Sequence, residues 1–96
     1  MNREDCLDKA KSIVVGERED TYGGPENSFG RIALLWSAYL NASGVAVTLT
    51  ATDVALLMDL MKTARLISAP DHADSWVDKA GYAACGCEVS TARTSP

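Results

Sequence analysis

Two acids lie four residues apart in the segment HADSWVDKAGYAA, which covers residues 72–84. At about 100° per residue, Asp74, Asp78 and the later Tyr82 fall on one stripe of a helix. Carboxylates grouped in this way are typical ligands of Mg²⁺. An Asp near a helix start is also favoured by capping and by the helix dipole. The pair is therefore a candidate metal or catalytic site, and two solvated acids are the alternative.

The rest of this helix divides into two stripes. Gly81 and Cys85 continue the acidic stripe. Since Gly costs about 1 kcal/mol of helix stability relative to Ala, we expect another helix or a ligand to approach closely at Gly81. The opposite stripe is expected to form ordinary core; it contains Trp76, Ala80, Ala83, Ala84 and Cys87.

The preceding helical segment carries charged residues of both signs. The stem of Arg65 can cover apolar surface while its guanidinium binds a carboxylate or a phosphate. Lys62 lies three residues after Asp59, a spacing that also allows a surface ion pair with a small contribution to stability. Asp53 follows Thr50 at the spacing of a capping box, with Asp in place of the usual Glu or Gln. Lys62 and Arg65 are therefore candidate phosphate ligands.

Composition and charge exclude several classes of protein. The chain has 96 residues and a net charge of −4, which argues against a surface for duplex DNA or RNA. It lacks the roughly 18 consecutive apolar residues of a membrane span, and its N-terminus lacks the apolar core of a signal peptide. Three cysteines and one histidine suit a reducing cytoplasm better than a disulfide framework or a zinc site.

Helical spacing of apolar residues predicts four helices joined by short loops. They cover about residues 3–15, 25–40, 50–67 and 72–90. Gly16 ends the first helix and Pro25 opens the second, as is typical of these residues. We therefore predict an all-α bundle of about four helices in a single domain, 1–96. Residues 1–16 hold the first helix, and residues 91–96 form a flexible tail.

The second helix is expected to be unusually apolar. Its main face contains Phe29, Ile32, Ala33, Trp36, Tyr39 and Leu40, whereas Leu34 and Leu35 lie outside the centre of that face. Such width indicates burial on more than one side. A chain this short buries only part of its apolar surface, and association is a common remedy. We therefore expect the chain to self-associate, as a dimer or a tetramer.

The loop before the second helix is rich in polar residues and glycine. Tyr22 is followed by two glycines and Pro25, directly before a helix N-terminus. Helix N-termini bind anions, and glycine lets a ligand approach the backbone. A tight turn explains the same residues at less cost.

Three segments together resemble a family of short phage and prophage proteins of unknown function. They are ERED-TYGGPENSFGRIALLWSAYL, DVALLMDLMKTARL and DSWVDKAGYAACG, and the resemblance covers about residues 14–88. If the chain is phage-encoded, we expect it in the host cytoplasm.

A more distant similarity is to the MazG-type all-α nucleotide pyrophosphohydrolases. These bundles assemble as dimers or tetramers, hold Mg²⁺ with acids from two helices, and cleave nucleoside triphosphates to monophosphate and pyrophosphate. The resemblance implies Mg²⁺ held by Asp74 and Asp78, with Asp53 or alternatively Asp59 as a third ligand. Asp74 and Asp78 would have the catalytic role. The sequence departs from that family at Lys62, where an acid is expected, and in the four-residue spacing of the two acids.

Three functional hypotheses follow. The first is a phage-type nucleotide-handling protein, either a Mg²⁺-dependent hydrolase or a related nucleotide-processing enzyme. In it, Lys62 and Arg65 would neutralise phosphate, and the nucleotide would contact Tyr22, Trp36 or Tyr82. The second is a non-catalytic binder that sequesters a nucleotide in an oligomer pocket. The third is a small phage protein that binds a host protein through Leu34 and Leu35. Whether the chain is an enzyme stays open at this point.

Overall fold

The computed structural model describes residues 1–16 and 24–91 of the chain. This part contains four α-helices and no strand. They are α1 (Arg3–Val15), α3 (Pro25–Ala42), α4 (Ala51–Ser68) and α5 (Ala73–Thr91). The prediction of an all-α bundle of about four helices is confirmed. The polar loop at residues 17–23 and residues 92–96 of the predicted tail lie outside the described part.

The helix boundaries follow local capping chemistry. Asn2 caps α1 by accepting a hydrogen bond from the backbone N–H of Asp5 at 2.8 Å. At the start of α4, the backbone N–H of Asp53 donates to Thr50 Oγ1 at 3.3 Å, and the backbone N–H of Thr50 donates to Asp53 Oδ2 at 2.8 Å. This reciprocal pair is the predicted capping box. It satisfies two backbone donors that a helix start leaves without partners.

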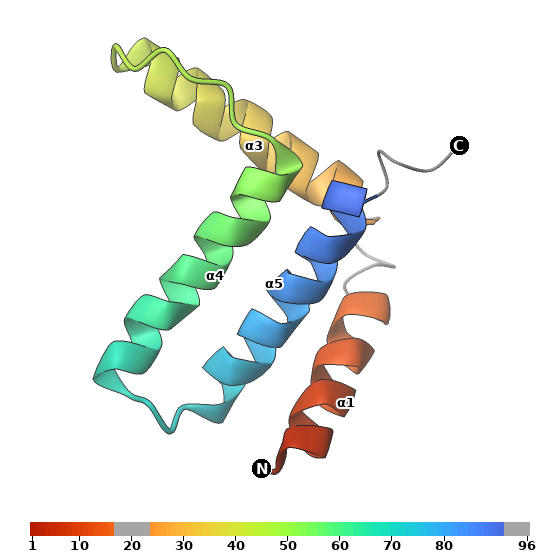
Figure 1. Cartoon of the computed structure of the whole chain (residues 1–96). Coiled ribbons are helices and arrows are strands. Elements are labelled where there is room, and N and C mark those ends of the chain that lie inside the picture. Colours follow the sequence, from red (N-terminus) through yellow and green to blue (C-terminus); the bar gives the residue numbers. More distant parts are fainter. Residues whose placement is uncertain (17–23, 92–96) are drawn as a thin grey trace.

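Three helices lie side by side, with α5 between α1 and α4, and α3 crosses one end of α4 and α5 (Figure 1). The main core cluster forms where α3 meets α4; its buried residues are Phe29, Ala33, Val54 and Ala55. The far half of α3 projects beyond the other helices (Figure 1). The radius of gyration is 14.5 Å, whereas a compact chain of this length has about 12.5 Å. The arrangement is therefore open.

The segment between α3 and α4 runs back along α3 (Figure 1). Asn41 Nδ2 donates to the carbonyl of Val47 at 2.7 Å. Ser37 Oγ accepts from the backbone N–H of Leu49 at 2.8 Å. These two hydrogen bonds hold the segment against α3 without any neighbouring strand in the described part of the chain.

The prediction for the core stripe of α5 is wrong. Trp76, Ala83, Ala84 and Cys87 are exposed, and Ala80 is only half-buried. The buried residues of α5 are Ser75, Val77, Gly81 and Val89. The reason is that α1 and α4 pack on the side of α5 that carries the acids. The sequence correctly predicts two stripes on α5, but the buried stripe is the one that contains the acids, not the one that contains the alanines.

Close approach at Gly81 explains why a glycine stands there. A Cβ atom at this position would lie 3.1 Å from Val14 Cγ1 of α1, a separation tighter than ordinary van der Waals contact. The sequence predicts that a helix or a ligand approaches Gly81, and in the structure this is α1. The loss in helix propensity at Gly81 thus accompanies tight packing of two helices.

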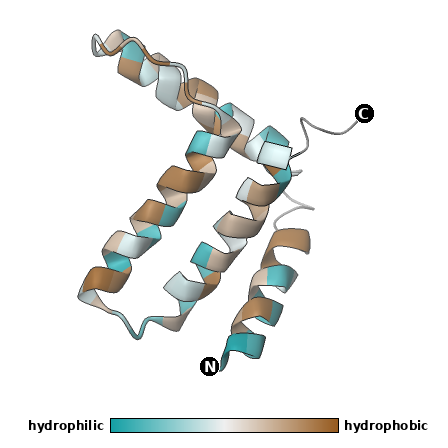
Figure 2. Cartoon of the chain, viewed as in Figure 1, coloured by the Kyte–Doolittle hydropathy of each residue, from teal (hydrophilic) through white to brown (hydrophobic). Residues whose placement is uncertain are grey.

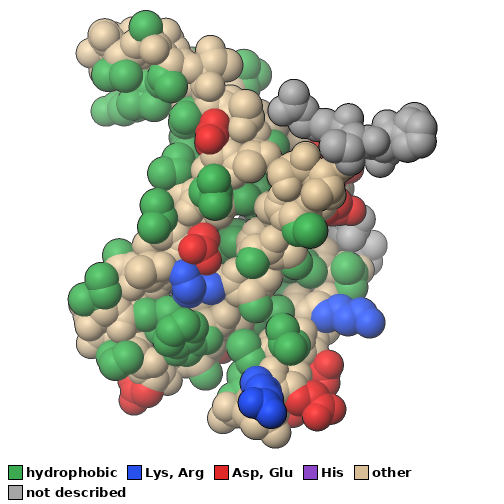
Figure 3. Space-filling model, in the orientation of Figure 1, with side chains coloured by type: hydrophobic (Ala, Val, Ile, Leu, Met, Phe, Trp, Pro, Cys, Tyr) green, Lys and Arg blue, Asp and Glu red, His purple; other side chains and the backbone are tan. Residues whose placement is uncertain are grey.

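Many large apolar side chains of α3 and α4 are exposed. On α3, Leu34 and Leu35 are exposed, so the described chain does not supply the burial on a second side that the sequence predicts. Tyr39 is exposed as well, contrary to its predicted place in the apolar face. On α4 the exposed apolar residues form one stripe, called here the outer α4 face: Leu56, Leu57, Leu60, Met61, Ala64 and Ile67. Figure 2 shows hydrophobic residues along both helices, and Figure 3 shows such side chains at the surface over them. Among the described residues, no helix is long and apolar enough to cross a membrane.

Candidate functional site

The two acids of α5 each have a lysine partner on another helix. Asp74, in the first turn of α5, lies 3.3 Å from Lys9 Nζ of α1. Asp78 lies one turn later, and its Oδ2 atom is 2.8 Å from Lys62 Nζ of α4. The Lys9–Asp74 pair is exposed, whereas the Lys62 side chain is only 12% exposed. The acidic stripe of α5 therefore joins α5 to both of its neighbours.

The third predicted metal ligand lies away from these two acids. Asp53 caps the start of α4 and precedes Lys62, the partner of Asp78, by nine residues, or about 13 Å along the helix. Within residues 1–16 and 24–91, no group of three or more His, Cys, Asp or Glu side chains could hold a metal ion. One chain thus does not bring Asp53, Asp74 and Asp78 together in its described part. Magnesium binding stays a prediction.

A second ion pair joins α4 and α5, and here the lysine is on α5 and the aspartate on α4. Lys79 Nζ of α5 lies 3.0 Å from Asp59 Oδ1 of α4 and donates to Thr63 Oγ1 at 2.6 Å. The predicted pair of Asp59 with Lys62 within α4 is therefore wrong. Each of these residues pairs across to α5 instead, where the partners are partly shielded from water. Charge-assisted hydrogen bonds of this kind are stronger than the exposed pairs expected from helical spacing.

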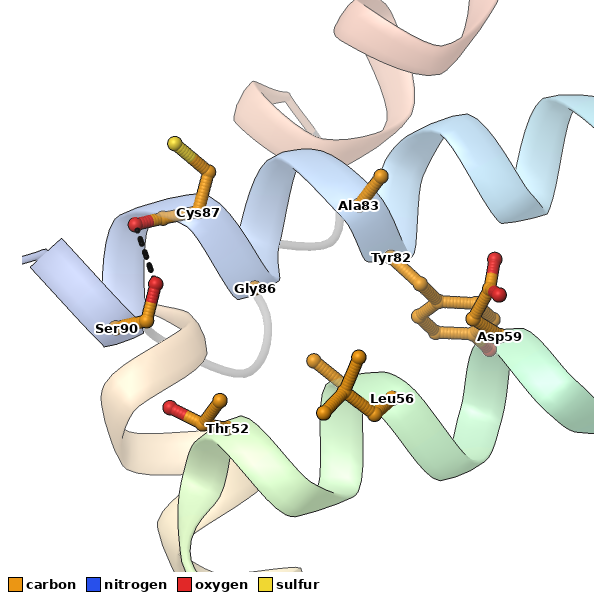
Figure 4. A pocket seen from close by; sticks show the side chains of 9 residues that line it. Thr52, Leu56, Asp59, Tyr82, Ala83, Gly86, Cys87 and Ser90 are labelled. Atoms are coloured by element: carbon orange, nitrogen blue, oxygen red, sulfur yellow. Dashed lines mark hydrogen bonds between the residues drawn. The ribbon is translucent and has the colours of Figure 1, made fainter.

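A cavity of about 370 Å³ lies between α4 and α5 (Figure 4). The lining residues are Thr52, Ala55, Leu56 and Asp59 of α4 with Tyr82, Ala83, Gly86, Cys87 and Ser90 of α5. Small side chains let the helices come close beside it, because a Cβ atom on Gly86 would lie 3.2 Å from Ala55 Cβ. The volume is at the lower end of the range typical of small-molecule sites, about 300–1,000 Å³.

The cavity combines apolar walls with a few polar groups. Tyr82 of α5 and Asp59 of α4 both line the cavity (Figure 4). The Tyr82 ring also packs against Phe29 of the core, with ring centroids 6.3 Å apart and a tilt of 44°. The hydroxyl of Thr52 lines the cavity, and so does that of Ser90, which donates to the carbonyl of Cys87 at 3.2 Å. An aromatic face, a carboxylate and two hydroxyls can together orient a small planar ligand.

The predicted ligand-binding residues are dispersed. Tyr82 lines the cavity, whereas Lys62, Arg65 and Trp36 do not. Trp36 packs against the core cluster, and Arg65 is exposed on α4. Tyr22 lies outside the described residues.

Sequence reasoning missed the cavity itself. Thr52, Asp59 and Thr63 share one side of α4, and the signal for this was their helical spacing. Local sequence patterns do not predict the register of α4 against α5, and this register places Asp59 beside Lys79.

Comparisons with known proteins identify the family. The family model described as domain of unknown function DUF6378 matches residues 5–90, so the chain belongs to this family. It is 44% identical over 82 residues to the Gene 55 protein of Mycobacterium phage D29, covering 85% of this chain and 51% of the relative. It is 42% identical over 77 residues to the Gene 55 protein of Mycobacterium phage L5, covering 80% of this chain and 47% of the relative.

The chain thus spans about half the length of these curated relatives. No solved structure matches it. Membership of a family of unknown function with phage relatives agrees with the resemblance seen in the sequence. The similarity to MazG-type enzymes stays a prediction.

Proposed function

We propose that this member of the DUF6378 family binds a nucleotide in the cavity between α4 and α5. The observation that supports the proposal is that Tyr82 and Asp59 face one cavity from two different helices (Figure 4). A nucleotide needs a flat apolar surface for its base and hydrogen-bonding groups for its edges. This cavity offers both within one small volume.

The base would stack on the Tyr82 ring, which the contact with Phe29 holds in place. The Asp59 carboxylate accepts hydrogen bonds, and so would pair with an amino group of the base or with a ribose hydroxyl. The Thr52 hydroxyl can donate and accept, whereas the Ser90 hydroxyl, which donates to the Cys87 carbonyl, can accept. Both would contact the remaining polar edges of the nucleotide. The Leu56 side chain supplies apolar wall.

The phosphates would be neutralised by lysine. Lys79 Nζ lies 3.0 Å from Asp59 Oδ1, so an ammonium stands directly beside a carboxylate that lines the cavity. A phosphate oxygen would compete with Asp59 for that ammonium, since both are anionic acceptors. Lys62, a predicted phosphate ligand, follows Asp59 by three residues along α4 and would contact a longer phosphate chain. Arg65, the other predicted ligand, follows Asp59 by six residues and lies about 120° around the helix from it.

Mg²⁺-dependent hydrolysis is the second candidate function. It rests on Asp74 and Asp78, which lie one turn apart on α5 and carry the oxygen ligands that Mg²⁺ prefers. Both carboxylates are neutralised by lysines, at 3.3 Å and 2.8 Å. Binding without turnover therefore fits the ion pairs of this chain better than hydrolysis does.

Binding of a host protein is the third candidate. It is supported by the exposure of Leu34 and Leu35 on α3, because exposed apolar patches are typical of interaction surfaces. In all three proposals the chain acts in the cytoplasm of the host. Since the chain spans only about half the length of the curated relatives, any activity of a whole relative is also a proposal for this chain.

The test is incubation of the chain with mixed nucleoside triphosphates and Mg²⁺, followed by chromatography of the protein-bound and free fractions. Asp59→Asn and Asp78→Asn form a matched pair of variants. Both side chains are 34% exposed and pair with a lysine across α4 and α5, but only Asp59 lines the cavity. We expect nucleotide retained unchanged, at least about tenfold weaker binding in Asp59→Asn, and a change below about twofold in Asp78→Asn.

The other outcomes decide between the candidates. Conversion of a triphosphate that requires Mg²⁺ and is lost in Asp78→Asn would assign hydrolysis to the acids of α5. Equal loss of binding in both variants would contradict the cavity as the site. A chain that neither retains nor converts any nucleotide would leave the host-protein proposal.

A further inference from the structure

We infer that the cavity between α4 and α5 takes a nucleoside monophosphate whose phosphate is bound by Lys79, and that the triphosphate of the same base binds more weakly. The inference rests on the proposed function, because it names the class of nucleotide for the same cavity. It follows from the charges in and beside the cavity, and from the size of the cavity.

The walls of the cavity carry no positive charge. Among the described residues that line it, Asp59 is the one charged side chain, and none is Lys, Arg or His. A chain of phosphates inside the cavity would therefore meet a carboxylate and no cation. Burying anionic groups without partners is unfavourable, so the part of the ligand inside the cavity should be its base and sugar.

The ammonium of Lys79 has one donor that the described chain does not use. Of its three N–H groups, one donates to Asp59 Oδ1 at 3.0 Å and another to Thr63 Oγ1 at 2.6 Å. The third can donate to one phosphate oxygen while the other two bonds stay in place. The positive charge of Lys79 is already balanced by Asp59, so the pair offers little attraction to further phosphoryl groups.

The other cations of α4 are poorly placed for a longer phosphate chain. Lys62 lies 2.8 Å from Asp78 Oδ2, and its side chain is only 12% exposed. Arg65 lies about 120° around α4 from Asp59. A triphosphate would have to take Lys62 from Asp78 to neutralise its additional charge. Since that would leave a partly buried carboxylate without its partner, we expect it to weaken binding of the triphosphate.

The size of the cavity agrees with this charge balance. Its volume of about 370 Å³ is at the lower end of the range for small-molecule sites, about 300–1,000 Å³. Such a volume fits the smaller nucleotides better than the larger ones. A base on the Tyr82 ring and one phosphoryl group beside Lys79 would use the groups that the cavity offers.

The test is calorimetric titration of the unmodified chain with adenosine, AMP, ADP and ATP, and with the same series for guanine, cytosine and uracil. For the base that binds most tightly, we expect the monophosphate to bind at least about tenfold more tightly than the triphosphate when Mg²⁺ is absent. Mg²⁺ neutralises part of the charge of a triphosphate, so its addition should reduce the difference.

Two matched variants test the role of Lys79. Lys79→Met removes the ammonium beside the cavity, whereas Lys9→Met removes a lysine that pairs with Asp74 of α5 outside it. The nucleoside and its monophosphate are compared within each variant, so a general loss of stability affects both ligands alike. We expect the monophosphate to bind about tenfold more tightly than the nucleoside in the unmodified chain and in Lys9→Met, and less than about twofold in Lys79→Met.

A salt titration of the unmodified chain makes the same comparison if Lys79→Met does not fold. Added salt should weaken binding of the monophosphate and leave binding of the nucleoside unchanged, because salt screens the contact between phosphate and ammonium.

The contrary results are distinct from one another. A triphosphate that binds as tightly as the monophosphate, or more tightly, would overturn the inference and leave the proposed function in place. An unchanged preference for the monophosphate over the nucleoside in Lys79→Met would also overturn it, because the phosphate would then bind elsewhere. A chain that binds no nucleoside and no nucleotide would overturn both the inference and the proposed function.

Discussion

The two sides of α4 differ in a way that composition alone would not predict. The side that faces α5 carries charged residues: Lys62 pairs with Asp78, and Asp59 pairs with Lys79. The opposite side, the outer α4 face, carries leucines and is exposed. An amphipathic helix ordinarily shows the reverse arrangement. The difference indicates that the contact of α4 with α5 is made within one chain, whereas the described part of the chain leaves the outer α4 face exposed.

The same contrast occurs within α3. Phe29 and Ala33 are buried against α4, whereas Leu34, Leu35 and Tyr39 on the other side are exposed. A helix that is apolar on all sides is typically buried on all sides. The described chain supplies cover for only one of these sides. Substitutions on covered and open surfaces should therefore have clearly different effects on the free energy of unfolding.

The largest difference is expected between two aromatic residues of α3. Phe29→Ala would leave a cavity in the main core cluster and should lower the free energy of unfolding by about 3–5 kcal/mol. Tyr39→Ala removes an exposed ring of similar size and should cost less than about 0.5 kcal/mol. Urea denaturation followed by circular dichroism measures both. Similar losses in the two variants would mean that the outer side of α3 is covered as fully as the core.

A smaller effect is expected where α1 meets α5. Gly81→Val places new atoms against Val14, whose Cγ1 already lies 3.1 Å from a Cβ at this position. We expect a loss of about 1–3 kcal/mol from overpacking. Gly30→Ala is the control, because a Cβ there meets nothing within 4 Å; it should stabilise the chain by about 0.5–1 kcal/mol through helix propensity. Thermal unfolding distinguishes the two, and a stabilising Gly81→Val would show that α1 does not pack closely.

The smallest effect concerns the ion pairs. Lys62→Met leaves the half-buried Asp78 without its partner and should cost about 1–2 kcal/mol, discounted for the partial exposure of Asp78. Lys9→Met breaks the exposed pair with Asp74 and should cost less than about 0.5 kcal/mol. Urea denaturation at low and high salt measures both variants. A larger loss of stability in Lys9→Met than in Lys62→Met would mean that the packing of α1 on α5 depends more on its ion pair than the packing of α4 does.

The fold could be predicted from the sequence to a large extent, because its signals are local. The box formed by Thr50 and Asp53 marks the start of α4, and Gly16 and Pro25 mark the limits of two other helices. Each signal acts within a few residues of where it stands. The helix boundaries therefore needed no knowledge of tertiary contacts.

The candidate site could be predicted only in part. Tyr82 was found, because helical spacing placed it on the same stripe as the acids. The partners of Asp59 and Asp78 were not, since each lies across to the other helix at a register that local patterns do not contain. The core of α5 was assigned to the wrong stripe for a related reason. Alanines look like core, but the side of α5 that packs against α1 and α4 carries Gly81 and the paired carboxylates of Asp74 and Asp78.

The most direct test of the contrast between the two sides of α4 is the mass of the unmodified chain in solution. Sedimentation equilibrium over a range of concentrations, with Leu60→Glu alongside, measures it without any assumption about ligand. The contrast predicts twice 10.2 kDa for the unmodified chain and dissociation in the variant. A mass of 10.2 kDa at every concentration would contradict it, and would mean that the outer α4 face stays open to water or awaits a different partner.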